Sequence, residues 1–197
     1  MHSKSAREYI CEIGRRLYRA GLVRGSDGNF SIRLSPDEIM ITPAGFSKGY
    51  LEPSDLVVIN MQGDVLHGDK QPSSEYRLHL AAYQVREDVE AVVHSHPPFA
   101  TAFSVAGREF PQHVLPEIDI FFPNGVPIAA YQGSGTTELA EEMRAYYRDY
   151  DLIIMSHHGV VSIGGDIFTA WRLTEHLEAC AETLFYANGL GGISRPR

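Results

Sequence analysis

Short apolar runs with a two-residue alternation recur along the chain and predict β-strands. In residues 30–34, Phe-Ser-Ile-Arg-Leu, apolar and polar side chains alternate as they do along a β-strand. Residues 152–155, Leu-Ile-Ile-Met, are apolar throughout, which is typical of a strand buried on both faces. The predicted strands cover residues 30–34, 38–42, 56–60, 90–95, 126–130, 151–156 and 160–163.

Segments with apolar residues three and four apart lie between these strands and predict helices. In residues 5–21 the apolar side chains fall on one side of a helix that Gly21 ends. Further helices are predicted for residues 73–86, 99–105, 136–147 and 166–188. Hairpins are mixed with helical crossovers, so we expect an α/β fold with a central mixed, largely antiparallel β-sheet flanked by helices.

The length and charge of the chain limit the number of domains and the kinds of partner that we expect. We expect residues 1–197 to form a single domain, with a core at about 6–188 and a loose tail at 189–197. The net charge of -8 argues against a nucleic acid or an anionic membrane as a partner. No apolar stretch approaches the ~20 residues that cross a bilayer and no signal-like core follows Met1, so a cytoplasmic location is expected, with Cys11 and Cys180 as free thiols.

Two pairs of histidines follow apolar runs. His94 and His96 end the strand predicted at 90–95, and the two-residue period of a strand places both imidazoles on one face. Taken alone, this pair is equally well explained as two ordinary histidines. A second pair, His157 and His158, follows the buried run at 152–155 in the same way. Three imidazoles and one carboxylate form a stable zinc site that leaves a position open for a substrate, so the four histidines predict a metal centre.

The carboxylate best placed for this centre is Glu75, in the first turn of the helix predicted at 73–86. A carboxylate there is also favoured by the helix dipole, but the histidines that follow favour a functional role. Ser73 and Ser74 precede it, and their hydroxyls and the free helix amides can hold an anion. The remaining histidines are interpreted as supporting, surface or packing residues: His67, His79, His113, His157 and His176.

Five separated motifs occur in the order seen in class II aldolase/adducin-type domains: Gly28-Asn29, Thr42-Pro43-Ala44-Gly45, Pro72-Ser73-Ser74-Glu75, Val93-His94-Ser95-His96 and His157-His158-Gly159. Over residues 6–188 the chain resembles this family, and within it the fuculose-phosphate-aldolase-like zinc enzymes. The resemblance implies Zn²⁺, or another divalent transition metal, held by His94, His96 and His158. It also implies that Glu75 is the catalytic acid/base and approaches the metal, and that Asn29, Gly45, Ser73 and Ser74 bind a phosphate.

The resemblance further implies a class II aldolase that cleaves a small phosphorylated ketose to dihydroxyacetone phosphate and an aldehyde. It implies a homotetramer with sites at subunit interfaces. The alternatives are a methylthioribulose-1-phosphate-type dehydratase or a pentulose-phosphate 4-epimerase on the same site, and a non-catalytic adducin-like interaction domain. The chain departs from the family pattern at Ala44, where a threonine hydroxyl is missing, and in residues 115–119, which contain no matching tyrosine.

A Schiff-base aldolase would instead need a buried lysine. The three lysines, Lys4, Lys48 and Lys70, are all expected in polar loops or at the terminus, which argues against that chemistry.

Overall fold

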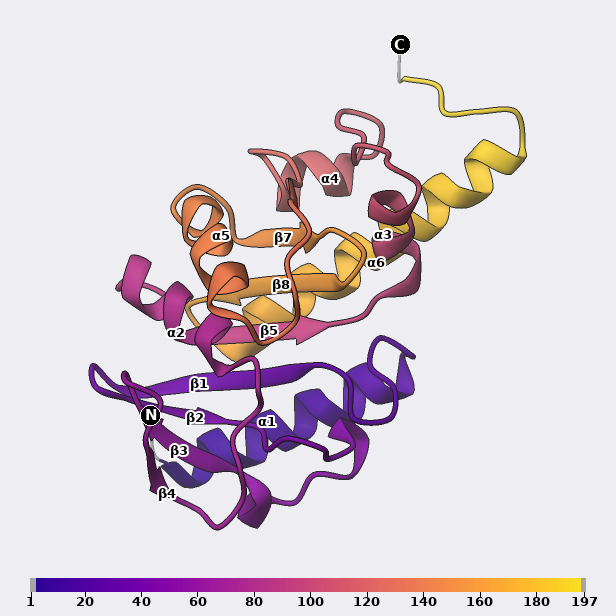
Figure 1. The fold of residues 1–197 in the computed structure, drawn as a ribbon. Helices are drawn as coiled ribbons and strands as arrows, with labels where there is room; N and C mark the ends of the chain where they lie inside the picture. Colours follow the sequence, from indigo (N-terminus) through magenta and orange to yellow (C-terminus); the bar gives the residue numbers. More distant parts are fainter. Residues whose placement is uncertain (1–2, 196–197) are drawn as a thin grey trace.

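The computed structural model describes residues 3–195. Eight strands form one sheet in the order β4-β3-β2-β1-β5-β8-β7-β6 (Figure 1). Neighbouring strands are antiparallel except for the parallel pair β6 and β7. The predicted mixed, largely antiparallel sheet is therefore confirmed. The strands are β1 (Asn29–Ser35), β2 (Glu38–Ile41), β3 (Val57–Asn60), β4 (Val65–His67), β5 (Ala91–Ser95), β6 (Ile128–Ala129), β7 (Leu152–Met155) and β8 (Gly159–Gly164).

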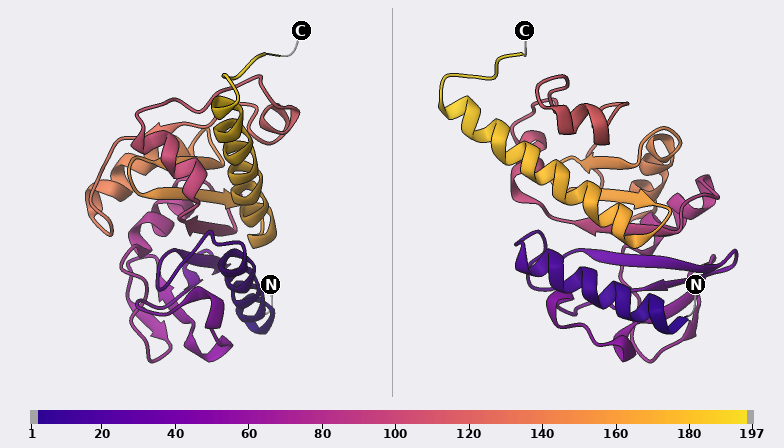
Figure 2. Two further views of the ribbon diagram at one scale, coloured as in Figure 1. Left: turned by 90° about the vertical axis from the view of Figure 1, so that its right-hand side faces the viewer. Right: turned by 180° about the vertical axis from the view of Figure 1, so that it is seen from behind.

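Helices cover both faces of the sheet. Helices α1 and α6 run along one face, as the view from behind in Figure 2 shows, and α2 and α5 pack together on the other. The helices are α1 (Ser3–Arg19), α2 (Tyr76–Val85), α3 (Pro98–Val105), α4 (Pro116–Phe121), α5 (Thr137–Tyr147) and α6 (Ile167–Gly189), with 3₁₀ turns η1 (Lys48–Tyr50) and η2 (Pro53–Asp55). In the described residues no helix is long and apolar enough to cross a membrane.

Alternation along the two central strands decides which side chains face α2. In β5, Ala91 and Val93 pack in the core beneath α1 and α6, whereas Val92 packs beneath α2 and α5. His94, two residues after Val92, therefore faces α2. In β1, Phe30 packs toward α1. Its neighbours in sequence, Asn29 and Ser31, therefore face α2, as His94 does. These polar residues of β1 and β5 thus lie on the face of the sheet that α2, with Glu75 at its N-terminus, covers.

The elements differ from the sequence prediction in a few places. The helix predicted from Ser73 begins at Tyr76, because Ser73 pairs with the end of β2 through its N–H to Thr42 O and turns the chain there. The strand predicted at 126–130 shrinks to β6, since Pro127 has no N–H to donate. Strand β4 and helix α4 were not predicted.

The predicted boundaries of the domain stay a prediction. Helix α6 reaches Gly189, where the loose tail was expected to begin, and residues 196 and 197 of that tail lie outside the described residues. Cys11 in α1 and Cys180 in α6 are buried and free, as expected.

Close packing of α1 against η1 gives a stability prediction. A Cβ atom on Gly14 would overlap the carbonyl oxygen of Lys48. We expect Gly14→Ala to lower the free energy of unfolding by about 1–3 kcal/mol, because overpacking forces the helix away. Urea denaturation measures this. Gly189→Ala is the control: no atom lies within 4 Å of that position, so stability should stay or rise by up to about 1 kcal/mol. Equal stability of the two variants would contradict the tight contact.

Candidate metal centre and active site

Three imidazoles meet at the carboxyl end of β5. His94 is in β5, His96 follows that strand, and His158 lies in the turn between β7 and β8. One ring nitrogen from each histidine lies within 4.8 Å of the others, so the group can hold a metal ion. The structure therefore brings together the three histidines singled out in the sequence. His157 is not in this group, and its side chain is exposed.

A hydrogen bond orients the ring of His94 toward the other two rings. The Nδ1 of His94 donates to the backbone oxygen of Val160 at 2.9 Å, which leaves Nε2 as a lone-pair donor to a metal. That Nε2 is 3.0 Å from the Nε2 of His96, while the Nδ1 of His96 lies 3.8 Å from Asp27 Oδ2. Two nitrogen lone pairs this close repel each other unless a proton or a cation lies between them. The donor set therefore fits a metal ion.

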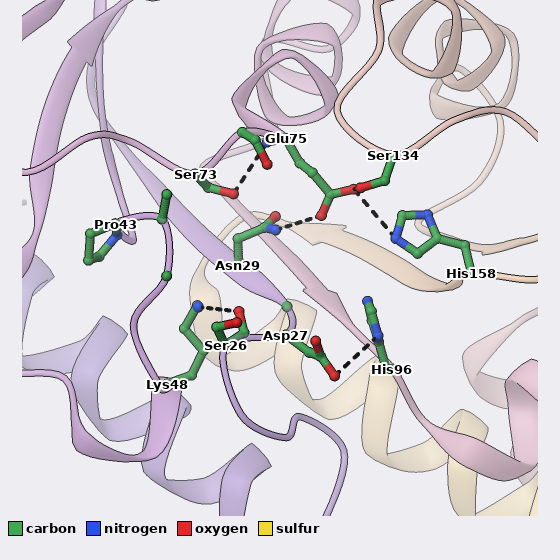
Figure 3. Close-up of a pocket in the computed structure, with 14 residues that line it drawn as sticks. Ser26, Asp27, Asn29, Pro43, Lys48, Ser73, Glu75, His96, Ser134 and His158 are labelled. Atoms are coloured by element: carbon green, nitrogen blue, oxygen red, sulfur yellow. Dashed lines mark hydrogen bonds and ion pairs between the residues drawn. The ribbon is translucent and has the colours of Figure 1, made fainter.

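Glu75 faces this group from the N-terminus of α2. Its side chain is buried, with Oε2 3.2 Å from His94 Nε2 and Oε1 3.4 Å from His158 Nε2. Asn29 Nδ2 donates to Oε2 at 2.8 Å and the Ser134 hydroxyl donates to Oε1 at 2.9 Å (Figure 3). Each carboxylate oxygen thus accepts a hydrogen bond from Asn29 or Ser134 and also lies close to one histidine nitrogen. Ser134 was not among the predicted residues.

Burial and neighbouring charges set the protonation of these groups. Burial lowers the pKa of His96 to about 3 and that of His158 to about 4, and the charge on His94 adds to both effects. Both rings are therefore neutral near pH 7, the form that binds metals. Burial opposes the charge on Glu75 and on His94, but their ion pair outweighs it: the pKa of Glu75 lies below its usual value and that of His94 above.

A cavity of about 210 Å³ lies beside the carboxylate. Loop 43–45 forms one wall and is fastened to the segment before α2, because Ala44 N donates to Gln71 O at 2.9 Å. At Gly45 the backbone has a φ of +77° and no atom lies within 4 Å of a Cβ position, so the glycine leaves this wall open. Of the residues predicted for the phosphate and for the metal, all but the fully buried His94 share the lining of this cavity: Asn29, Gly45, Ser73, Ser74, Glu75, His96 and His158.

Lys48 corrects the expectation that the lysines lie in polar loops. Its side chain lines the cavity, yet the residue is only 1% exposed. Its Nζ donates to the backbone oxygen of Ser26 at 2.8 Å (Figure 3) and to that of Phe46 at 2.6 Å. Burial lowers the pKa of Lys48 to about 8, although Asp27 and Glu75 act against the shift. The ammonium is therefore mostly charged near pH 7 and supplies a cation to this cavity.

Comparison with known proteins assigns the family. The family described as Class II Aldolase and Adducin N-terminal domain matches residues 8–185. The chain belongs to the class II aldolase and adducin family. This class II aldolase-type chain is 37% identical over 182 residues to L-fuculose phosphate aldolase of Methanococcus maripaludis, covering 92% of this chain and 95% of that protein.

Two further similarities bear on fold and reaction. A solved structure of L-fuculose 1-phosphate aldolase matches with a TM-score of 0.90 at 27% identity, covering 100% of this chain and 92% of that one. The 3-oxo-tetronate 4-phosphate decarboxylase of Haemophilus influenzae is 32% identical over 192 residues, or 96% of this chain and 91% of that protein. The predicted fold and the prediction of a class II aldolase-type enzyme are confirmed. The names of these relatives give different reactions, an aldol cleavage and a decarboxylation.

Gly159 gives a test of the metal centre in this class II aldolase-type chain. A Cβ atom there would lie 2.5 Å from Ser95 O and 2.9 Å from Cδ2 of His96. We expect Gly159→Ala to displace the histidine rings and to weaken Zn²⁺ or Co²⁺ binding roughly 10–100-fold. Competition with a chromogenic chelator measures this affinity. Gly165→Ala, where the nearest atom is 3.9 Å away, is the control and should bind metal like the unchanged protein. Unaltered affinity in Gly159→Ala would refute the role of the three rings.

Proposed function

We propose that the chain is a Zn²⁺-dependent aldolase that cleaves a small phosphorylated ketose, similar to fuculose 1-phosphate, to dihydroxyacetone phosphate and an aldehyde. The observation that carries this proposal is the buried Glu75 carboxylate, which lies 3.2 Å from His94 Nε2 and 3.4 Å from His158 Nε2, beside a cavity that Ser73, Ser74 and Lys48 also line. The relatives named as aldolases of a phosphorylated sugar support the substrate class.

His94, His96 and His158 would hold the metal, and Glu75 lies close enough to join them. Three imidazole nitrogens and one carboxylate suit Zn²⁺, and other divalent transition metals accept the same donors. When bound, the ion supplies a Lewis acid for the negative charge that develops on substrate oxygens.

Glu75 is the proposed acid/base. In cleavage it would return a proton to the carbon next to the ketone, and in condensation it would remove that proton. Asn29 and Ser134 donate to its two oxygens and so fix the plane of the carboxylate. The protein therefore holds the base at one atom position before a substrate arrives.

The opposite wall of the cavity is the proposed phosphate pocket. Ser73, Ser74 and the backbone of Gly45 line it, and Asn29 keeps a second Nδ2 hydrogen besides the one that it donates to Glu75. Lys48 adds the positive charge that a chain of net charge -8 must supply locally. Binding energy at the phosphate would position the reacting carbon against Glu75.

A decarboxylase is the second candidate, supported by the relative of that name. Loss of CO₂ next to a ketone leaves a carbanion like that of aldol cleavage, so the same base and metal would serve. From a 3-oxo-tetronate 4-phosphate the product would again be dihydroxyacetone phosphate. The dehydratase and epimerase alternatives predict other products on the same site.

The homotetramer with sites at subunit interfaces and the cytoplasmic location stay predictions. Light scattering tests the first, and fractionation of the source cells tests the second.

The reaction is tested with a panel of ketose 1-phosphates together with a 3-oxo-tetronate 4-phosphate. We expect dihydroxyacetone phosphate and an aldehyde from at least one ketose 1-phosphate. Glu75→Gln should lower this turnover by about 10²–10⁴-fold, since the amide cannot accept the proton. The control is Glu87→Gln, an exposed carboxylate just after α2. CO₂ without an aldehyde would favour the decarboxylase, and dehydrated or epimerised products would reject the aldolase.

Lys48 is tested by Lys48→Met. Loss of the cation should raise KM for the phosphorylated substrate by about tenfold or more, with kcat changed much less, because the phosphate contact serves ground and transition states alike. In the unchanged protein, affinity should fall as pH rises through about 8, where Lys48 loses its proton. Lys70→Gln, on the exposed loop before Ser73, is the control. An unchanged KM in Lys48→Met would exclude the contact.

A further inference from the structure

A row of buried polar side chains runs between α2 and β1, away from the cavity. Glu75, His79 and Tyr83 are four residues apart along the helical segment, and Asn29 and Ser31 are two apart on β1. Four helical residues rise about 6.0 Å and two strand residues about 6.6 Å, so the two spacings match. Side chains from helix and strand therefore alternate in one line that begins at Glu75 and ends at Tyr83.

Each neighbouring pair in this row is within hydrogen-bond distance. Asn29 Nδ2 lies 2.8 Å from Glu75 Oε2, and Asn29 Oδ1 lies 2.5 Å from His79 Nε2. Ser31 Oγ lies 2.7 Å from His79 Nδ1 and 2.7 Å from the Tyr83 hydroxyl. All five residues are at most 6% exposed, and His79 and Ser31 are completely buried.

Only one arrangement of hydrogens satisfies all these groups. An ionised Glu75 can only accept, so Asn29 turns its NH₂ toward the carboxylate and its oxygen toward His79. His79 must then carry its proton on Nε2 and accept at Nδ1 from the Ser31 hydroxyl. Ser31 in turn accepts from Tyr83. Burial lowers the pKa of His79 to about 3, which keeps its ring neutral and able to donate and accept.

We propose that His79 is a positioning residue for the catalytic carboxylate: it holds Asn29 with its amide directed at Glu75, and Ser31 and Tyr83 fix the tautomer of His79. This inference rests on the proposed role of Glu75 as acid/base. Here every donor, from the Tyr83 hydroxyl onward, points toward the one carboxylate that faces the three imidazoles.

Two substitutions of His79 by amide side chains of different length distinguish a positioning role from a packing role. Glutamine at position 79 can place an NH₂ where His79 has Nε2, whereas asparagine reaches only the position of Nδ1. We expect His79→Asn to lower kcat roughly 10–100-fold with KM for the phosphorylated substrate changed less than about threefold. His79→Gln should stay within about fivefold of the unchanged kcat. Equal kcat values for the two variants, whether high or low, would overturn the proposal.

A measurement on the unchanged protein covers the case in which a variant does not fold. In ¹⁵N-histidine-labelled protein, the ring signals that disappear in His79→Gln or, failing that variant, shift in Tyr83→Phe belong to His79. We expect a neutral ring protonated on Nε2 near pH 7. A ring protonated on Nδ1, or on both nitrogens, would contradict the row.

The outcomes also separate this inference from the proposed function. Turnover lost in Glu75→Gln but kept in His79→Asn overturns the positioning role alone. Turnover kept in Glu75→Gln overturns the function of Glu75 and, with it, any catalytic purpose of the row. Metal content, measured on the His79 variants, should stay equal to that of the unchanged protein, since the ring nitrogens of His79 are bonded to Ser31 and Asn29 and not to the three imidazoles; loss of metal in His79→Asn would instead assign the kinetic defect to the metal centre.

Discussion

The pairing of β1 with β5 is the constraint on which the site depends. Its register sets Asn29 directly opposite His94, with both side chains on the face covered by α2. A slip of one residue would send either side chain into the apolar core beneath α1 and α6. The carboxylate of Glu75 can meet an amide donor and an imidazole at once because this single pairing places them side by side. The antiparallel ladder, buried on both faces, thus has a chemical consequence as well as a structural one.

The alternation of strands and helices could be predicted from the sequence because the apolar periods are clear. Residues 30–34 alternate as expected, and residues 152–155 are apolar because helices cover both faces of the sheet. The apolar pattern did not predict elements that bury few side chains. Strand β4 has three exposed residues at the sheet edge, and α4 is a six-residue helix that begins with Pro116. The late start of α2 depends on a bond from Ser73 to Thr42, 31 positions away, which no local pattern contains.

The site residues, too, could be predicted from the sequence only in part. The three histidines could be found because each follows an apolar run, and a strand that ends there brings its next polar residue to the sheet edge. The burial of Lys48 could not be predicted, because it results from the turn at Ser26 and from the close packing of α1 on η1, two separate segments of the chain. His79 is an intermediate case. Its spacing of four from Glu75 is visible in the sequence, but its purpose appears only when the polar residues of β1 lie beside it.

The position of β5 in the sheet has a consequence for how the protein is made. Its two neighbours are β1, which precedes it in the chain, and β8, whose paired residues come 65 to 73 positions later. A nascent chain that ends before His158 therefore has β5 with one open edge and only two of the three clustered histidines. The centre comes into being when β8 closes that edge and His158 arrives with it. Assembly of the site is thus a late event of synthesis, tied to completion of the sheet.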